Sequence, residues 1–113
     1  MMERNNKGVL VLGYRPMSSL EIKMDKIIKE NKLSYKFVGN GKFSIERKVP
    51  DFINTNGEKI ALEVFYRKHK NVFSGRLDNW MNKRKELFMK YGWKIEFFNE
   101  CQVNNEEVIR RLN

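Results

Sequence analysis

Two carboxylates stand in positions where a buried β-strand ordinarily carries apolar side chains. Asp51 lies between Val49 and Ile53, and Glu63 lies within the run 60–66, whose two faces are otherwise apolar. Side chains alternate between the faces of a strand, and a strand that is apolar on both faces is typically covered on both sides. A carboxylate in such a strand is unfavourable unless it is paired, hydrogen-bonded or bound to a metal. The two acids therefore predict a functional site.

A site of this kind has a definite chemistry. Two carboxylates on adjacent strands supply oxygen ligands for Mg²⁺ or Mn²⁺, hard cations that keep several waters and accept phosphate oxygens. A metal held there can acidify a water and stabilise the charge that develops at a phosphodiester. Without a metal, Asp51 and Glu63 held close together would repel each other, and one of them would hold a proton. We therefore expect metal affinity to depend on pH.

The chain between the two acids is typical of a β-hairpin. Residues 49–53 and 60–66 are two runs rich in apolar side chains, and the cluster Asn-Thr-Asn-Gly at 54–57 separates them. An Asn-Gly pair between β-branched and aromatic residues is the strongest short-range signal of a hairpin. The two acids are therefore expected on neighbouring antiparallel strands.

The register of this hairpin decides whether the two acids meet. A two-residue turn would pair Asp51 with Leu62 and point Glu63 to the other face. A three-residue loop that ends at a left-handed Gly57 would pair Asp51 with Ala61 instead. Glu63 would then be the diagonal neighbour of Asp51 on the same face, about 7–8 Å away. We predict the three-residue loop, because it lets both side chains converge on one cation.

A third acid stands at the start of a predicted helix. Ser18 and Glu21 have the S-x-x-E spacing of a capping box, which marks the beginning of a helix. Apolar residues follow at helical spacing towards Leu33, namely Leu20, Met24, Ile27 and Ile28. Glu21 borders this apolar face. It is either only the capping partner of Ser18 or also faces the hairpin site, and the two roles are compatible.

The second half of the chain predicts a β-α-β crossover. The strand 60–66 is followed, after residues 71–75, by a helix that runs roughly to Tyr91 and ends at a left-handed Gly92. Its apolar stripe, which Arg84 interrupts, consists of Leu77, Trp80, Leu87, Phe88 and Tyr91. A strand over 93–98 comes next. Parallel strands joined through such a helix form a right-handed crossover.

Shorter elements complete the expected fold. Residues 35–38 and 43–45 are predicted strand pieces around a Gly-Asn-Gly turn, and Asn104 or Asn105 caps a short final helix. The sum is an α/β fold with a small mixed sheet, an antiparallel hairpin plus a parallel β-α-β strand, flanked by helices. At 113 residues we expect one domain over 1–113, with residues 1–7 flexible.

The composition favours a polyanionic partner. The chain has 23 basic and 14 acidic residues, a net charge of +9, which indicates nucleic acid. Contacts from Lys and Arg to phosphates give an affinity that depends on salt and not on sequence. We expect four basic side chains to contact DNA: Arg67, Lys68, Lys70 and Arg84. Three further lysines on the second helix are expected to be only solvated: Lys83, Lys85 and Lys90.

The low numbers of cysteine and histidine residues and the hydropathy of the chain exclude several classes of protein. The single Cys101 excludes an internal disulfide, and with the single His69 it excludes a zinc site of the Cys/His type. Residues 1–7 are polar, and the run 8–13 is too short for a signal-peptide core or a membrane span. We therefore expect a cytoplasmic protein with no membrane partner. The oligomeric state is left open.

The order of these motifs resembles a known family. PDF at 50–52, a short turn, IALEVF at 60–65 and a downstream His are similar to the Vsr-type branch of the PD-(D/E)XK nucleases. That branch includes very short patch repair endonucleases and the small EDxHD homing endonucleases. The preceding YKFVGNGKF and the later GWKIEFFNE resemble the lead-in and the closing strand of the family, so that the resemblance covers about residues 18–113. It implies a restriction-endonuclease-like core and Mg²⁺- or Mn²⁺-dependent cleavage of DNA.

The resemblance also implies roles for individual residues. It places metal ligation on Asp51 and Glu63, and it makes an acid near the start of the first helix, Glu21, part of the active site. The general pattern has a lysine two residues after the second acid, where this chain has Phe65. Vsr-type members lack that lysine too and use a histidine shortly after the strand. Here that residue is His69, a candidate general base or acid.

Two departures from the family pattern leave a second function open. The small residue usual after this strand is Tyr66, which can crowd the loop before His69. The later Asp of the EDxHD set has no secure match, since Asp78 lies about one helical turn early. The sequence predicts a metal-dependent DNA endonuclease that hydrolyses phosphodiester bonds, by repair-type nicking or by homing- or restriction-type cleavage. The alternative is a catalytically degenerate nucleic-acid-binding module that retains the nuclease fold.

Overall fold

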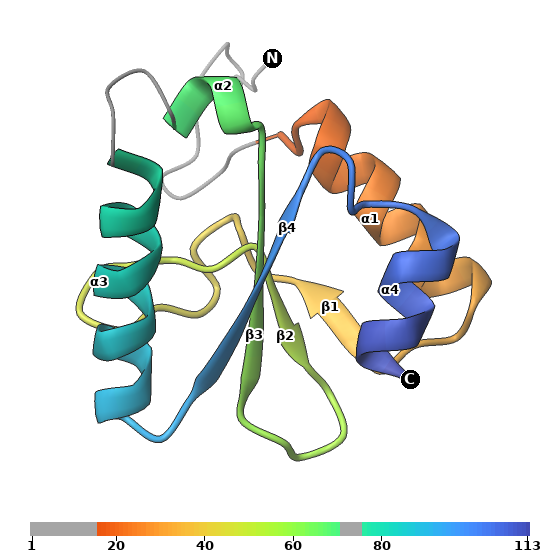
Figure 1. Cartoon of the computed structure of the whole chain (residues 1–113). Coiled ribbons are helices and arrows are strands. Elements are labelled where there is room, and N and C mark those ends of the chain that lie inside the picture. Colours follow the sequence, from red (N-terminus) through yellow and green to blue (C-terminus); the bar gives the residue numbers. More distant parts are fainter. Residues whose placement is uncertain (1–15, 71–75) are drawn as a thin grey trace, which may run out of the picture.

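The computed structural model describes residues 16–70 and 76–113, which form three layers (Figure 1). A four-stranded sheet in the order β1-β2-β3-β4 is the middle layer. Helices α1 and α4 pack on one face of the sheet, and α3 packs on the other. The elements are α1 (Ser19–Glu30), β1 (Tyr35–Phe37), β2 (Phe52–Asn54), β3 (Ile60–Phe65), α2 (Arg67–Lys70), α3 (Arg76–Lys90), β4 (Lys94–Asn99) and α4 (Asn105–Leu112). No helix within these described residues is long and apolar enough to cross a membrane.

The sheet is mixed. β1 pairs antiparallel with β2, and β2 with β3, whereas β3 and β4 run parallel and are joined through α3. The predicted α/β class, with an antiparallel hairpin and a parallel β-α-β strand, is therefore confirmed. Because β2 and β3 run in opposite directions, the beginning of β2 and the end of β3 lie at the same end of the sheet.

Each face of the sheet has its own hydrophobic core. The core under α1 and α4 contains the fully buried rings of Phe52 and Phe98 together with Leu62. The core under α3 contains Ala61 and the fully buried Phe88. Neighbouring residues of β3 point to opposite faces, so this one strand serves both cores. The alternation seen in the sequence is thus explained by a central strand that is covered on both sides.

The hairpin register differs from both registers considered from the sequence. Phe52 pairs with Leu62, and Ile53 pairs with Ala61. The predicted pairing of Asp51 with Ala61 is therefore wrong, and the two-residue turn is absent as well. The loop between the strands is wider than three residues.

The wider loop has a local cause in the side chain of Asn54. Its Oδ1 accepts hydrogen bonds from the backbone N–H groups of Asn56 and Glu58, at 2.8 and 3.1 Å. Such side-chain-to-backbone bonds compete with the strand ladder and stabilise turns. Gly57 has a φ of +99°, the left-handed conformation that was predicted for it.

Fewer residues between β1 and β2 adopt a β-strand than the sequence predicts. Residues 43–45 do not form a strand, and an isolated bridge between Ile45 and Lys48 is found there instead. The first hairpin strand begins at Phe52 and not at residue 49. Pro50 explains the delay, because proline has no backbone N–H to donate to a ladder.

The helices begin close to the expected residues. Ser18 caps α1 through a complete capping box, and Asn104, of the two candidates, caps α4. The apolar stripe of α3 is shorter than predicted, because Phe88 is fully buried but Tyr91 is 45% exposed. Tyr91 follows the end of α3, and its hydroxyl group donates to the carboxylate of Glu46 at the surface. Its assignment to the buried stripe is therefore wrong.

Gly92, which links α3 to β4, allows a first test. Its φ is +83°, and a Cβ there would meet only the side chain of Lys59, at 3.8 Å. A substitution at this position is therefore disfavoured by backbone conformation and not by a clash. We expect Gly92→Ala to lower the free energy of unfolding by about 1–2 kcal/mol, and Gly92→Asn by less, because asparagine tolerates the left-handed region. Urea denaturation measures both, and equal losses would contradict this explanation.

Candidate active site

Glu21, Asp51 and Glu63 come together at the end of the sheet where β2 begins and β3 ends. They lie in the first turn of α1, directly before β2, and within β3, and Asp51 interacts with both of the others. Their exposed fractions are 6, 7 and 6%, and they are the charged residues buried in the described part of the chain. Burying three carboxylates is unfavourable unless their charge is reduced or matched. The neighbouring groups do both.

Glu21 has both of the roles considered for it. Its Oε1 accepts a hydrogen bond from the Ser18 N–H at 2.9 Å, and its own N–H donates to Ser18 Oγ at 3.2 Å. The Glu21 side chain is also hydrogen-bonded to Asp51. The capping box therefore fixes the start of α1 and at the same time holds Glu21 against the hairpin.

Asp51 carries a proton at neutral pH. Burial, the nearby charge of Glu63 and the hydrogen bond with Glu21 together raise the pKa of Asp51 to about 9. One hydrogen bond, which the Val64 N–H donates to Asp51 Oδ2 at 2.8 Å, lowers the pKa of Asp51. A hydrogen bond between two carboxyl groups needs one proton, and the raised pKa of Asp51 supplies it. The cluster thus reduces its own charge by protonation.

Glu63 is matched by a guanidinium group from α3. Arg84 Nη1 donates to Glu63 Oε2, and the two side chains are only 16 and 7% exposed. The guanidinium also lies over the ring of Trp80, 5.6 Å from its centroid. Arg84 therefore points inward in this structure, and the phosphate contact expected for it stays a prediction.

Sequence reasoning missed the Glu63–Arg84 pair, although a signal was present. Arg84 interrupts the apolar stripe of a helix, and Glu63 interrupts the apolar face of a strand in the same β-α-β unit. The helix of such a unit packs against its own strands. Because buried charges are almost always paired, these two interruptions are expected to meet.

His69 lies at the surface on α2, a helical turn where the sequence predicts a loop. Its ring packs against the ring of Tyr66, with centroids 5.3 Å apart, and the backbone N–H of His69 donates to the Tyr66 carbonyl oxygen at 3.0 Å. The Tyr66 hydroxyl is hydrogen-bonded to Ser19 Oγ at 2.9 Å, which ties the end of β3 to α1. Tyr66 therefore stands beside His69, as expected. The catalytic role of His69 stays a prediction.

The basic residues of α2 have different surroundings. The backbone N–H and the Nε of Arg67 each donate to the Glu100 carboxylate at 3.0 Å, and Arg67 Nη2 donates to Cys101 Sγ at 3.0 Å. Lys68 is exposed, and the side chain of Lys70 lies outside the described residues. Their contacts with DNA stay predictions. For Arg67, a phosphate would have to compete with Glu100.

Asp51 and Glu63 fit a hard divalent cation by their chemistry. Both are oxygen donors, and Mg²⁺ is usually held by one or two carboxylates while waters and phosphate oxygens complete its shell. Within residues 16–70 and 76–113, no three His, Cys, Asp or Glu side chains are arranged as a metal site. For a cation to bind, Asp51 would have to lose its proton and Glu63 would have to leave Arg84.

Comparison with known proteins adds no assignment to this geometry. No protein-family model, no curated protein and no solved structure matches the chain. The resemblance to Vsr-type nucleases therefore rests on the sequence motifs alone.

The raised pKa of Asp51 predicts a pH-dependent stability. The folded state binds this proton far more tightly than the unfolded chain, whose aspartate pKa is near 3.8. Its stabilising effect is complete below about pH 4 and is lost as the pH rises towards 9. Between pH 5 and 8 we expect the unfolding free energy to fall by up to about 1.4 kcal/mol per pH unit from this group.

Asp51→Asn removes the titrating group while keeping its shape. We expect the variant to lose this slope and to be more stable than the wild type at pH 8, as measured by urea denaturation across the pH range. Asp25→Asn is the matched control, because Asp25 lies on the outer part of α1 and pairs with Lys29 at 2.9 Å. Identical slopes for wild type and Asp51→Asn would show that Asp51 is ionised in the folded protein.

Proposed function

We propose that this chain is a metal-dependent DNA endonuclease that hydrolyses phosphodiester bonds at the cluster of Glu21, Asp51 and Glu63. The proposal includes a restriction-endonuclease-like core, in which the metal-binding acids are Asp51, directly before β2, and Glu63 of β3. Support comes from the family resemblance of the motifs, from the net charge of +9, and from the meeting of the three acids at one end of the sheet.

The observation that carries the proposal is the burial of three carboxylates from three separate segments of the chain. A cluster of like charges lowers the stability of a fold, and an apolar replacement of similar volume is often more stable. Groups whose pKa is strongly shifted by burial and by specific partners gather at functional sites. Asp51 meets this description, because burial and two neighbouring acids act on it together.

The proposed chemistry divides between a cation and the residues of the chain. A Mg²⁺ or Mn²⁺ ion held by Asp51 and Glu63 would supply Lewis-acid activation of water and phosphate. To hold the cation, Asp51 would have to be ionised, and Glu21, which its capping box holds in place, would keep the Asp51 carboxylate oriented. Glu63 would have to leave Arg84 in order to hold the cation. The Arg84 guanidinium would then be available to a phosphate group. This planar group can donate two parallel hydrogen bonds to phosphate oxygens.

The exposed position of His69 suits proton exchange with solvent. It lies on α2, which only Tyr66 separates from the end of β3, and the acids lie at this end of the sheet. In the proposed function it donates a proton to the leaving oxygen or accepts one from the attacking water. The neighbouring Arg67, Lys68 and Lys70 provide phosphate contacts along the same edge.

The alternative function, a nucleic-acid-binding module without catalysis, is favoured by one observation. Arg84 already neutralises Glu63, so that Glu63 has a partner without any cation. In that case the pair is a structural element that replaces a metal site. The alternative keeps the DNA contacts and removes the cleavage.

Cleavage of supercoiled plasmid with Mg²⁺ or Mn²⁺ tests the proposal. We expect the wild type to nick or linearise the plasmid, and Asp51→Asn and Glu63→Gln to lose about 100-fold or more of that rate, the scale on which one transition-state-stabilising group acts. His69→Ala should lower the rate in a manner that depends on pH. Gel-shift affinity for the same DNA should change little in all three variants.

Glu58→Gln is the matched control for Glu63→Gln, because Glu58 is an exposed residue of the hairpin loop. It should cleave at the wild-type rate. Binding without cleavage by the wild type, on duplex, mismatched and branched DNA, would establish the binding module instead. A failure to bind DNA at low salt would contradict both functions.

A further inference from the structure

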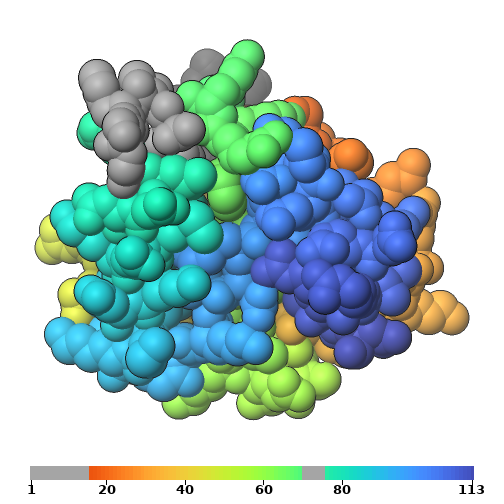
Figure 2. All heavy atoms as spheres, viewed as in Figure 1, coloured from red at the N-terminus to blue at the C-terminus, as the bar shows by residue number. Residues whose placement is uncertain are grey.

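A groove separate from the acid cluster runs along β4 between α3 and α4. Figure 2 shows β4 at the bottom of a hollow between these two helices, and the hollow has a volume of about 910 Å³. Its lining includes Met81 and Met89 from α3 and Ile95 and Phe97 from β4. Met89 is 70% exposed, so apolar surface faces solvent along this wall.

The floor of the groove offers an open strand edge. β4 is last in the strand order, so it is an edge of the sheet that the described residues form. The Lys94 N–H donates to the Lys59 carbonyl oxygen on the β3 side, at 2.9 Å. Backbone groups alternate between the two sides of a parallel strand, so the N–H and C=O groups of Ile95 and Phe97 point away from β3 and into the groove. Such a row of groups is a template for an added strand.

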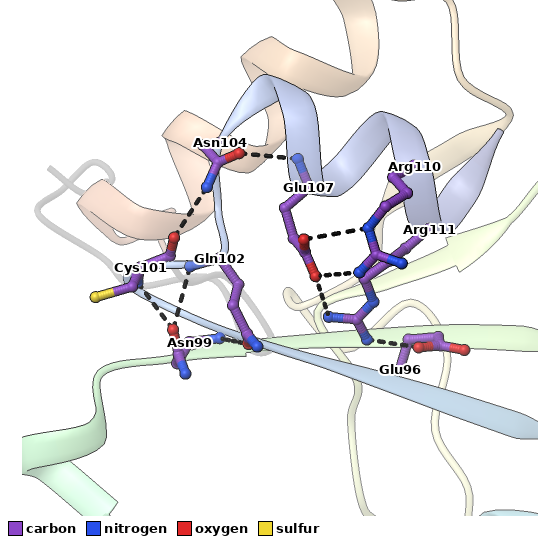
Figure 3. Close-up of polar contacts among 8 residues, drawn as sticks. All are labelled: Glu96, Asn99, Cys101, Gln102, Asn104, Glu107, Arg110 and Arg111. Carbon is purple, nitrogen blue, oxygen red and sulfur yellow. Dashed lines mark hydrogen bonds and ion pairs between the residues drawn. The ribbon is translucent and has the colours of Figure 1, made fainter.

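The α4 wall of the groove is held in place by hydrogen bonds at the end of β4. Figure 3 shows that Asn99 Oδ1 accepts from the N–H groups of Cys101 and Gln102, at 2.9 and 3.1 Å. Gln102 Oε1 in turn accepts from the Asn99 N–H at 2.9 Å. The free edge therefore ends before Asn99. Arg111 joins the wall to the floor, because it donates to Glu96 at 2.5 Å.

The groove carries an excess of positive charge. Four basic and two acidic side chains line it, namely Lys85, Lys94, Arg110, Arg111, Glu96 and Glu107. Both acids are already paired with arginines of α4 (Figure 3). Burial alone would raise the pKa of Glu96, but hydrogen bonds from Arg111 and Lys94 lower it. Lys94 also pairs with Glu96, at 3.1 Å, so that Lys85 is the groove base outside these pairs and the lining as a whole keeps two more positive than negative charges.

We propose that this groove binds an extended, acidic segment of another protein, which adds a fifth strand to the sheet beside β4. The backbone of such a segment pairs with Ile95 and Phe97, its apolar side chains meet the methionines and the floor, and its acids meet the basic rim. A second copy of this chain fits less well, because a two-fold contact sets the same positively charged patch against itself. A nucleic acid has no backbone N–H groups to pair with a strand. The inference does not depend on the endonuclease function.

The test uses a fluorophore-labelled nine-residue peptide that alternates valine and glutamate, with a valine-lysine peptide as the charge control. We expect the acidic peptide to bind in fluorescence polarisation and the basic one not to bind. Lys85→Glu should weaken binding about tenfold, roughly the effect of reversing one rim charge. Lys83→Glu is the matched control, because Lys83 lies on the same helix, is exposed and does not line the groove.

Amide hydrogen exchange, measured by NMR, tests directly whether the peptide backbone pairs with β4. Bound peptide should slow the exchange of the Ile95 and Phe97 amides. Equal binding to the Lys85→Glu and Lys83→Glu proteins, unchanged exchange at these two amides, or no binding of the acidic peptide would each overturn the proposal. Protection of the same amides by self-association, without peptide, would assign the groove to a second copy. Their protection by an oligonucleotide instead of the peptide would assign it to nucleic acid.

Discussion

Three carboxylates can be buried together only if their charge is removed or matched, and the centre of this fold is built around that constraint. Asp51 meets it with a proton, since its pKa is raised to about 9, and Glu63 meets it with the guanidinium of Arg84. The groups that compensate the two charges come from opposite sides of the sheet. Glu21 and its hydrogen bond to Asp51 belong to α1, whereas Arg84 belongs to α3. The acid cluster therefore couples the two hydrophobic cores through the strands between them.

In the proposed function, the same arrangement would link stability to metal binding. A proton on Asp51 and an ion pair at Glu63 stabilise the protein without a cation, and both would have to be given up for a cation to bind. Binding of a cation and release of a proton would then be parts of one equilibrium. The groove along β4 lies outside this exchange. It contains none of the three acids, although α3 carries both Arg84 and the groove residue Lys85, so the proposed partner at β4 and the proposed substrate at Asp51 would occupy different parts of the molecule.

The parts of the structure that follow from local rules could be predicted from the sequence. The capping box at Ser18, the left-handed Gly92 and the parallel β-α-β unit all depend on short-range patterns, and all are present. The hairpin register could not be predicted, because the side chain of Asn54 stabilises a wider loop than the Asn-Gly pair indicates. Residues 43–45 have apolar character without a partner strand, and such pairing is decided by long-range contacts.

The candidate site shows the same division between local and long-range information. The types and positions of Glu21, Asp51 and Glu63 already indicate a site, because acids in apolar patterns are rare. The sequence also predicted that one of the two strand acids would hold a proton, but it did not show which one, and the pairing of the other with Arg84 was missed. The orientation of Arg84 depends on how α3 packs across β3, and the proton on Asp51 depends on burial by both helices and strands.

The proposed exchange of a proton for a cation can be tested at one carboxyl group. Carbon-13 NMR of the Asp51 side-chain carboxyl group, titrated with pH in the absence and presence of Mg²⁺, tests it most directly. We expect Asp51 to stay protonated through neutral pH without the cation and to become ionised at neutral pH when Mg²⁺ is added. An Asp51 carboxyl group that is ionised at neutral pH without Mg²⁺, or one that Mg²⁺ leaves unchanged, would contradict the account.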